Sequence, residues 1–226
     1  MMDIIDSIKA AIVPPHRAGY PFIVGGLVVW LLGLLFAGWL AWLGLAFTLF
    51  CLFFFRDPPR VPPTRPHVLL APADGRVVLV DYAVPPAALG LPDLAVPRVA
   101  IFLSVLDVHV NRVPAPGMIT RIAYHPGKFL NAAHDKAADE NERNALAMRL
   151  DNGAMIAVVQ IAGLIARRIV CTAHEGDHLL AGERFGIIRF GSRTDLYLPP
   201  GAIPLVTIGQ RMIGGETVIA DLATPM

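Results

Sequence analysis

Residues 22–55 read FIVGGLVVWLLGLLFAGWLAWLGLAFTLFCLFFF, and this stretch divides the chain into two parts. Its 34 residues contain no Asp, Glu, Lys or Arg. Because about 20 apolar residues cross a bilayer once, the block is too long for one upright helix and short for two full ones. A tight helical hairpin broken near Gly38 or Gly44, a long tilted helix and a re-entrant pair are all compatible with this length. We therefore expect the block to be embedded in a membrane.

The flanks of this block bear on its topology. A cleaved signal peptide has an apolar core of roughly 7–15 residues followed by small residues, whereas this block ends in Phe55-Arg56. Basic residues lie on both sides, namely Lys9, His16, Arg17, Arg56, Arg60 and Arg65. Under the positive-inside rule this symmetry favours a hairpin with both ends in the cytoplasm. A buried helix of a soluble core is the less favoured alternative.

Three segments follow from this division. Residues 1–21 are an amphipathic leader, in which residues 3–9 are able to form a brief interfacial helix. Residues 22–55 are the membrane segment, and residues 56–226 are numerous enough to bury a single hydrophobic core of their own. The boundary between the last two is a stiff linker, because each proline of Pro58-Pro59 and Pro62-Pro63 restricts the backbone.

Short β-type runs separated by Gly, Pro and Asp fill residues 56–226, which predicts antiparallel sheets arranged as a sandwich or barrel. The expected strands cover residues 76–82, 98–104, 118–124, 145–150, 154–161, 165–172, 185–190, 194–198, 203–207 and 216–220. Asn152-Gly153 is a strong hairpin signal, because such turns require positive φ angles. Residues 131–144 are a polar helix-or-loop insertion. The predicted fold class is α+β, a β-rich domain behind a hydrophobic helical hairpin.

Charge and cysteine usage exclude several kinds of site. The formal net charge is +1, and no broad basic surface points to a nucleic acid partner. Cys51 and Cys171 fall in the apolar block and in an expected strand, so we expect no disulfide framework and a reducing compartment. His174 and His178 are of a metal-ligating type, but the sequence offers no obvious third anchor, and we expect no metal site.

The stretch ERFGIIRFGSRTDLYLPP, residues 183–200, contains the main candidate for chemistry. A β-type run ends at Phe190, Gly191-Ser192 interrupts it, and a second run follows. Glycine allows unusual backbone geometry and exposes its carbonyl, so the Ser192 hydroxyl is able to turn back onto the Gly191 carbonyl. An ordinary turn is the simplest alternative. A serine-hydrolase elbow, G-x-S-x-G, is excluded because Thr194 stands where that motif needs glycine.

Four further motifs accompany this stretch in the order in which one known family has them. They are FFFRDP at residues 53–58, APADG at 71–75, LSVLDVHVNR at 103–112 and DKAADENER at 135–143. Together with RFGSRTDLYLP at 189–199, they resemble the short prokaryotic branch of the phosphatidylserine decarboxylases, over roughly residues 15–215. Five ordered motifs are far more specific than any one of them.

The resemblance implies a carboxy-lyase that converts phosphatidylserine in the membrane to phosphatidylethanolamine and CO₂ in phospholipid biosynthesis. It also implies a zymogen that cuts itself between Gly191 and Ser192 into a β chain of residues 1–191 and an α chain of residues 192–226, held together as a heterodimer. Ser192 would become a pyruvoyl group that forms a Schiff base with the substrate amine and accepts the electrons of the breaking C–C bond. The expected location is the cytoplasmic face of the cell membrane.

The resemblance further assigns roles to single residues. Ser192 is the expected nucleophile and pyruvoyl precursor, and Asp74 and His109 are the expected orienter and base of the self-cleavage. Longer members of the family carry a second histidine where this chain has Arg112, which cannot act as a base. His109 then serves both steps, or another histidine takes part. Arg112 and Arg193 are expected to bind the lipid phosphate or carboxylate.

A non-catalytic membrane-anchored β-domain, acting as a binding or scaffold protein, is the alternative from a different functional class. Such a protein would keep the hairpin and the strands but would never cleave at Gly191-Ser192. The presence of Ser192 together with Asp74 and His109 favours the enzyme.

Overall fold

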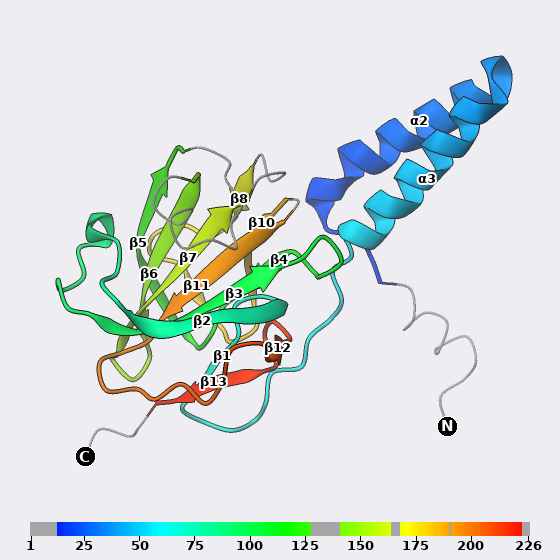
Figure 1. Cartoon of the computed structure of the whole chain (residues 1–226). Coiled ribbons are helices and arrows are strands. Elements are labelled where there is room, and N and C mark those ends of the chain that lie inside the picture. Colours follow the sequence, from blue (N-terminus) through cyan, green and yellow to red (C-terminus); the bar gives the residue numbers. More distant parts are fainter. Residues whose placement is uncertain (1–12, 128–140, 164–167, 190, 223–226) are drawn as a thin grey trace, which may run out of the picture. The chain divides into compact units, whose positions relative to one another are not determined.

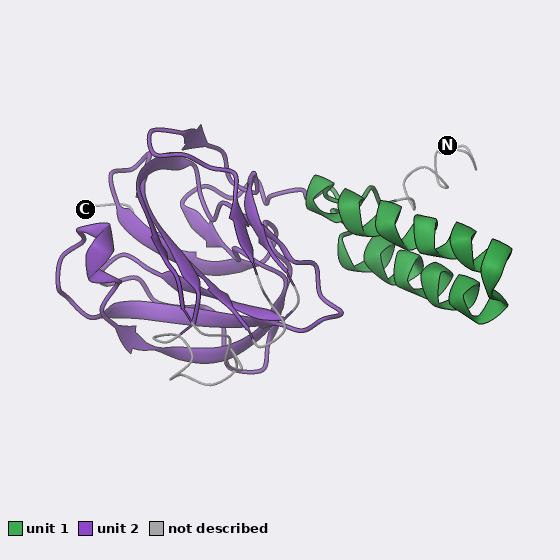
Figure 2. Cartoon of the chain, turned by 90° about the horizontal axis from the view of Figure 1, so that it is seen from above, with its two compact units in different colours: residues 1–59 green, residues 60–226 purple. Residues whose placement is uncertain are grey.

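A computed structural model of the chain describes residues 13–127, 141–163, 168–189 and 191–222. The chain forms two compact units that divide between Pro59 and Arg60 (Figure 2). This division falls within the proline-rich stretch that the sequence analysis interprets as a linker. The interfacial helix expected at residues 3–9 and most of the insertion expected at 131–144 lie outside the described residues.

The first unit is a hairpin of two helices, α2 (Tyr20–Phe36) and α3 (Gly38–Phe54), preceded by the short 3-10 helix η1 (Arg17–Gly19) (Figure 1). Among the possibilities for the apolar block, the hairpin is the one that forms, and the chain turns at Ala37, directly before Gly38. Each helix of 17 residues is about 25 Å long. Residues Arg17–Phe36 are long and apolar enough to cross a membrane.

The two ends of the hairpin lie beside each other. The His16 N–H donates to the Phe55 carbonyl at 2.7 Å, and the Asp57 N–H donates to the Pro14 carbonyl at 3.0 Å. The chain therefore enters and leaves the apolar block on the same side, as the symmetric basic flanks predict.

Small residues let α2 and α3 approach closely. The buried residues of α3, Ala41, Gly44, Thr48, Cys51 and Phe54, recur every three or four positions and so lie on one face. A Cβ atom added to Gly33 would lie 2.1 Å from the backbone N of Ala41, and one added to Gly44 would lie 2.4 Å from that of Trp30. Most other side chains of the hairpin are apolar and exposed, as expected for helices that face lipid.

The second unit is built from three antiparallel sheets (Figure 1). The largest has eight strands in the order β12-β2-β3-β11-β7-β6-β5-β9, and the smaller ones have the orders β4-β10-β8 and β1-β13. The strands are β1 (Val68–Leu70), β2 (Gly75–Ala83), β3 (Val96–Leu103), β4 (Val110–Arg112), β5 (Gly117–His125), β6 (Arg143–Leu150), β7 (Met155–Ala162), β8 (Ile169–Cys171), β9 (His178–Leu179), β10 (Arg184–Ile188), β11 (Ser192–Tyr197), β12 (Arg211–Met212) and β13 (Val218–Asp221).

The main core lies between the eight-stranded sheet and the two smaller sheets. Leu146, Ile156 and Leu196 of the large sheet form one buried cluster with Phe185 of β10 and Ile219 of β13. The opposite face of the large sheet is covered over part of its area by the segment that contains the 3-10 helix η2 (Ala87–Leu89). The β-rich α+β fold predicted from the sequence is confirmed.

Some predicted strands differ from the structure. Residues 203–207 form no strand, because Pro204 has no N–H to donate and makes only an isolated bridge to Ala220. The strand expected from residue 194 begins two residues earlier, at Ser192. The short strands β1, β4, β9 and β12 were not predicted, since two or three residues show no alternation.

The last three strands of the chain all pair with strands that come before Gly191. β11 lies between β3 and β7 and is paired with both along its whole length (Figure 1). β12 pairs with β2, and β13 pairs with β1. The segment that begins at Ser192 therefore contributes strands to the eight-stranded and the two-stranded sheets, but not to the three-stranded sheet.

Candidate active site

Ser192 is the first residue of β11 and is completely buried. It is paired with Leu103 on one side and with Ala162 on the other. Its Oγ atom has no hydrogen-bond partner among the described residues. Leaving a buried hydroxyl unsatisfied costs about 1–3 kcal/mol, so such a group calls for a functional explanation.

Gly191 presents both of its backbone polar groups to partners. Its N–H donates to Nε2 of His109 at 3.3 Å, and its carbonyl accepts from the Gly163 N–H at 3.1 Å. Its φ angle is +70°, in the left-handed region that favours glycine. A Cβ atom at this position would meet nothing within 4 Å, so it is the backbone conformation rather than lack of space that requires glycine.

His109 is fully buried, and its hydrogen bonds define its tautomer. Nδ1 lies 2.9 Å from the carbonyl oxygen of Asp107. A carbonyl only accepts, so Nδ1 carries the proton and Nε2 keeps its lone pair. That assignment agrees with the Gly191 N–H donating to Nε2. The basic nitrogen of His109 therefore faces the residue whose carbonyl Ser192 is expected to attack.

The loop that supplies this carbonyl is held by the side chain of its own aspartate. The backbone N–H and Oγ of Ser104 donate to Oδ2 of Asp107 at 2.9 and 2.7 Å. Arg211 donates to Oδ1 of the same carboxylate at 2.9 Å. The carboxylate fixes the loop, and the loop fixes the imidazole.

Asp74 lies just before β2 and binds other partners than His109. Its carboxylate accepts from Arg60 at 2.7 Å and from the Gly214 N–H at 2.8 Å. Burial raises the pKa of Asp74, and Arg60 and the Gly214 N–H partly oppose this rise. The nearby charge of Asp107 also raises the pKa of Asp74. Asp74 thus lies close to the loop that holds His109, without a hydrogen bond to the imidazole.

The two arginines expected to bind substrate are engaged elsewhere. Arg193 is buried and donates to both carboxylate oxygens of Asp195, at 2.6 and 2.8 Å. As the neighbour of Ser192 in a strand, it lies on the opposite face of the sheet. Arg112 is buried and donates to the Gly182 carbonyl at 2.9 Å. Their role in substrate binding stays a prediction.

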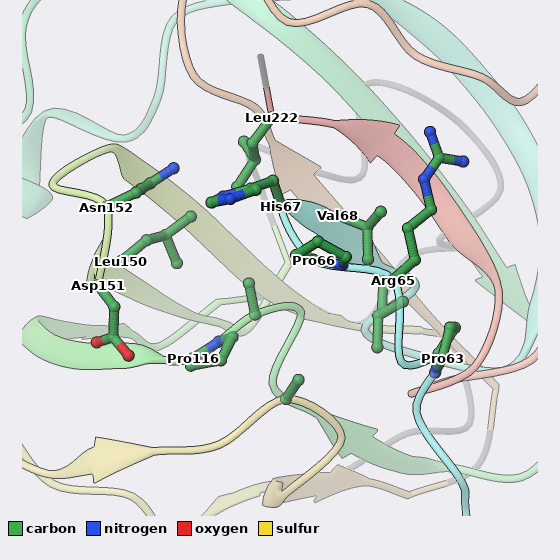
Figure 3. Close-up of a pocket in the computed structure, with 13 residues that line it drawn as sticks. Pro63, Arg65, Pro66, His67, Val68, Pro116, Leu150, Asp151, Asn152 and Leu222 are labelled. Carbon is green, nitrogen blue, oxygen red and sulfur yellow. The ribbon is translucent and has the colours of Figure 1, made fainter. Parts of the chain in front are cut away.

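The other residues considered from the sequence lie apart from Ser192. His178 contacts Asp151 at 2.8 Å, and no group of three or more potential metal ligands occurs within the described ranges. A cavity of about 460 Å³ is bounded on one side by Asp151 and Asn152 and on the other by Pro63, Arg65 and Val68 (Figure 3). Leu150, which also lines it, ends β6 six residues beyond Asn144 and so lies roughly 20 Å along the strand from it. Asn144 is level with Thr194, two residues after Ser192, because both are paired with Gln160 of β7. This cavity is therefore separate from the site around Ser192.

The sequence identified three of the groups that meet here and missed two. Gly191, Ser192 and His109 lie together in the structure. The Asp107 carbonyl and the Gly163 N–H were missed because both are backbone groups. The only signal in the sequence for the Asp107 carbonyl was that Asp107 lies two residues before His109. Together these groups place a serine hydroxyl, an imidazole and a backbone N–H donor around the Gly191 carbonyl, which is an arrangement suited to acyl transfer.

Comparison with known proteins agrees with this chemistry. Residues 47–220 match the family model described as phosphatidylserine decarboxylase. A phosphatidylserine decarboxylase proenzyme of Granulibacter bethesdensis is 66% identical over 221 residues, which cover 98% of this chain and 91% of that protein. Proenzymes of the same name from Gluconobacter oxydans and Cereibacter sphaeroides are 59% and 56% identical; they cover 98% and 97% of this chain, and the matches extend over 100% and 95% of those proteins.

Proposed function

The chain belongs to the phosphatidylserine decarboxylase family, and from this premise we propose that Ser192 is the residue at which it cuts itself and from which its pyruvoyl cofactor is made. The protein is a carboxy-lyase proenzyme that decarboxylates phosphatidylserine, and not the non-catalytic scaffold considered from the sequence. The observation that carries the proposal is the neutral Nε2 of His109 beside Gly191, with the unpartnered hydroxyl of Ser192 next in the chain.

The positions of these groups support the following course for the self-cleavage. His109 Nε2 takes the proton of the Ser192 hydroxyl, and the alkoxide attacks the Gly191 carbonyl carbon. The Gly163 N–H already points at that carbonyl oxygen and stabilises the negative charge that develops on it. The Gly191–Ser192 amide bond breaks, the Ser192 amine takes up the proton, and an ester joins the two residues.

The ester then opens by elimination. Loss of the Ser192 α-proton expels the carboxylate of Gly191, which becomes the C-terminus of the β chain, and leaves a dehydroalanine at position 192. Water converts that residue to a pyruvoyl group and ammonia, so that atoms balance without any oxidant. The pyruvoyl group supplies an electron sink for decarboxylation once it is bound to the substrate amine.

Asp74, Arg112 and Arg193 have supporting roles in this proposal. Asp74 assists His109 electrostatically, since its carboxylate lies near the loop that holds the imidazole. Arg112 and Arg193 remain our proposed contacts for the lipid phosphate or carboxylate. Both would first have to exchange the partners they hold, Gly182 and Asp195.

We further propose that the helical hairpin of residues 22–55 holds the enzyme at the cytoplasmic face of the membrane, where phosphatidylserine is present. The 20-residue apolar stretch Arg17–Phe36 and the shared side of the two hairpin ends support this placement. After cleavage, the α and β chains stay together as a heterodimer, because β11, β12 and β13 all pair with strands of the β chain.

The mass of the purified full-length chain under denaturing conditions tests the cleavage. We expect the wild type to yield residues 1–191 and a fragment of residues 192–226 that begins with pyruvoyl, and the two to co-elute under native conditions. Ser192→Ala stays whole, and His109→Ala is cleaved at least about 100-fold more slowly because it lacks the base. His178→Gln, an exposed histidine paired with Asp151, is the control and is cleaved like the wild type.

Two results would contradict the proposal. A wild-type chain that stays whole in its native membrane would contradict the proposal that Ser192 is converted to a pyruvoyl cofactor. Cleavage of His109→Ala at the wild-type rate would remove His109 from the mechanism and leave the role of base to another group.

A further inference from the structure

A row of buried polar side chains crosses the eight-stranded sheet next to Ser192. Asn144 on β6, Gln160 on β7 and Thr194 on β11 are paired with one another in register. All three are at most 3% exposed. Thr194 lies two residues after Ser192, so the row is on the same face of the sheet as the nucleophile. Beyond this row, the same face carries the apolar core.

The row is bonded to a residue of the other sheet. Asn144 Nδ2 donates to Gln160 Oε1 at 3.0 Å, and Gln160 Nε2 donates to Oδ1 of Asn111 at 2.7 Å. Asn111 Nδ2 reaches Thr194 Oγ1 at a longer 3.5 Å. Asn111 belongs to β4, in the three-stranded sheet. The Gln160–Asn111 hydrogen bond therefore connects the eight-stranded sheet, which contains Ser192, with the three-stranded sheet, whose strand β4 begins directly after His109.

The short strand β4 needs such a connection. It has three residues, lies at the edge of its sheet and pairs with β10 alone among the described strands, and its Arg112 N–H donates to the Pro72 carbonyl at 2.8 Å. His109 precedes it directly, and His109 and Asn111, two positions apart, point to the same face. The Ile188 N–H of β10 also donates to the His109 carbonyl at 3.2 Å, so His109 belongs to the same hydrogen-bonded sheet that Asn111 joins to the large sheet.

Gly186 makes room for this contact. It lies on β10 opposite Asn111, and a Cβ atom added to it would lie 2.5 Å from the Val170 carbonyl oxygen of β8 and 3.0 Å from Gln160 Nε2. A side chain at position 186 would push the Gln160 amide away from β4. Gly186 and the Gln160 amide thus both contact the part of the three-stranded sheet that contains Asn111, two residues after His109.

We propose that Gln160, through Asn111, is a positioning residue that aligns His109 with Gly191 and Ser192 for self-cleavage. This inference rests on the proposed cleavage at Gly191-Ser192. A buried amide chain gives no more stability than apolar packing of the same volume, but its directional bonds specify one alignment of two sheets. Alignment is what the reaction requires, since a misplacement of about 1 Å can cost roughly 100-fold in rate.

The test measures the rate of self-cleavage in full-length variants together with their thermal stability. Gln160→Met keeps the volume and removes both hydrogen bonds, and we expect cleavage to slow by about 10- to 100-fold. Met148→Ala is the control. It removes a buried side chain from the same face of β6 as Asn144, lowers Tm and leaves the rate of cleavage unchanged.

A conservative variant keeps the test interpretable if Gln160→Met folds poorly. Burial favours the neutral form of a carboxyl group, so Gln160→Glu can still donate to Asn111 and accept from Asn144. We expect it to cleave faster than Gln160→Met. In the matured fraction of Gln160→Met, kcat for decarboxylation should fall without a change in KM, if His109 also serves that step.

The outcomes separate this inference from the proposed function. A wild-type chain that does not cleave itself would overturn the proposed function. A wild type that cleaves itself, with Gln160→Met no slower than Met148→Ala at the same loss of Tm, would overturn the positioning role and leave the proposed function intact.

Discussion

A carbonyl group, and not a carboxylate, holds the proton on Nδ1 of His109. A neutral acceptor fixes the tautomer but stabilises a protonated imidazole less than a carboxylate does in a serine–histidine–aspartate set. In the proposed mechanism self-cleavage occurs once in the life of each molecule, so a base of modest strength is sufficient. The carboxylate of Asp107 contributes by shaping the loop, through Ser104 and Arg211.

The buried carboxyl of Asp74 gives stability a pH dependence that can be measured. Because burial raises its pKa in the folded state, the folded protein binds the proton more tightly than the unfolded chain. Its contribution to stability is complete below the unfolded pKa and is lost as the pH rises through the folded pKa. We expect the Tm of the wild type minus that of Asp74→Asn to be largest near about pH 4 and to shrink towards about pH 7.

Thermal scans of both proteins in the same detergent across that range provide the measurement. A difference that grows with pH would mean that attraction to Arg60 outweighs burial. Asp74→Asn should also cleave itself more slowly than the wild type if Asp74 supports His109.

Side chains of this site were accessible from the sequence, and backbone groups were not. Gly191, Ser192 and His109 belong to short sequence motifs, and their side chains or backbone conformations are what the proposed reaction needs. The Gly163 N–H reaches the Gly191 carbonyl only because β7 and β11 pair so that Ala162 faces Ser192. Such register is set by packing between distant segments. Gln160 likewise gave no signal, because an isolated glutamine in an apolar strand resembles any other.

Strand β11 presents different chemistry on its two faces. Ser192 and Thr194 point to the interior, while Arg193 and Asp195 form a buried ion pair on the other face. Arg98 joins them at 3.4 Å from Asp195 and also binds Asp81 at 2.7 Å. Burial disfavours the charged form of Arg98, but the hydrogen bonds to Asp81 and the charge of Asp195 outweigh this and raise its pKa. These contacts hold the strand that carries the nucleophile.

Removing the central acid should destabilise the fold strongly. Asp195→Asn removes the negative charge that pairs with the buried Arg193, and it also removes the ion pair with Arg98. Breaking a buried pair typically costs about 3–5 kcal/mol. Chemical denaturation, in a Ser192→Ala background that keeps the chain whole, measures the free energy of unfolding. Arg65→Gln is the control, because the Arg65–Asp221 pair is exposed and such pairs contribute about 0–1 kcal/mol. Equal losses in both variants would contradict this account.

Runs of β-type residues bounded by Gly, Pro and Asp predicted the long strands, whereas the short strands β1, β4, β9 and β12 were not predicted. β2, β3, β5, β6 and β7 lie where the pattern placed them, since each buries one face or both over many residues. β4 has three residues, all buried, and therefore no periodicity. Its importance for the site arises from its place beside β10, which no local pattern encodes.

The molecule consists of two units with separate cores, so damage to one should leave the other working. Gly44→Leu forces a side chain against the backbone of Trp30 and should open the hairpin. We expect Cys51, which is buried in the hairpin, to react faster with a maleimide, while self-cleavage at Gly191-Ser192 continues at the wild-type rate. Gly25→Leu is the control, because a Cβ atom there meets nothing within 4 Å.

Mass analysis of the peptide that contains Cys51 gives the labelling rate. Loss of self-cleavage in Gly44→Leu, with normal cleavage in Gly25→Leu, would show that the two units depend on each other. At this scale the sequence predicted the hairpin and the linker from length, charge and proline content. It could not give the order of strands in the sheets, because that order depends on contacts between segments far apart in the chain.

The pairing of β11, β12 and β13 with strands before the cut has a consequence for the lifetime of the enzyme. If the chain is cut where we propose, the uncut chain folds with its strands tethered, whereas a matured molecule that unfolds releases the fragment of residues 192–226 into solution. Reassembly then depends on the meeting of two dilute chains. The working life of each molecule is set by its unfolding rate and not by its folding equilibrium. Cleavage at this position thus turns a single chain that is able to refold by itself into a complex of two chains that assembles once.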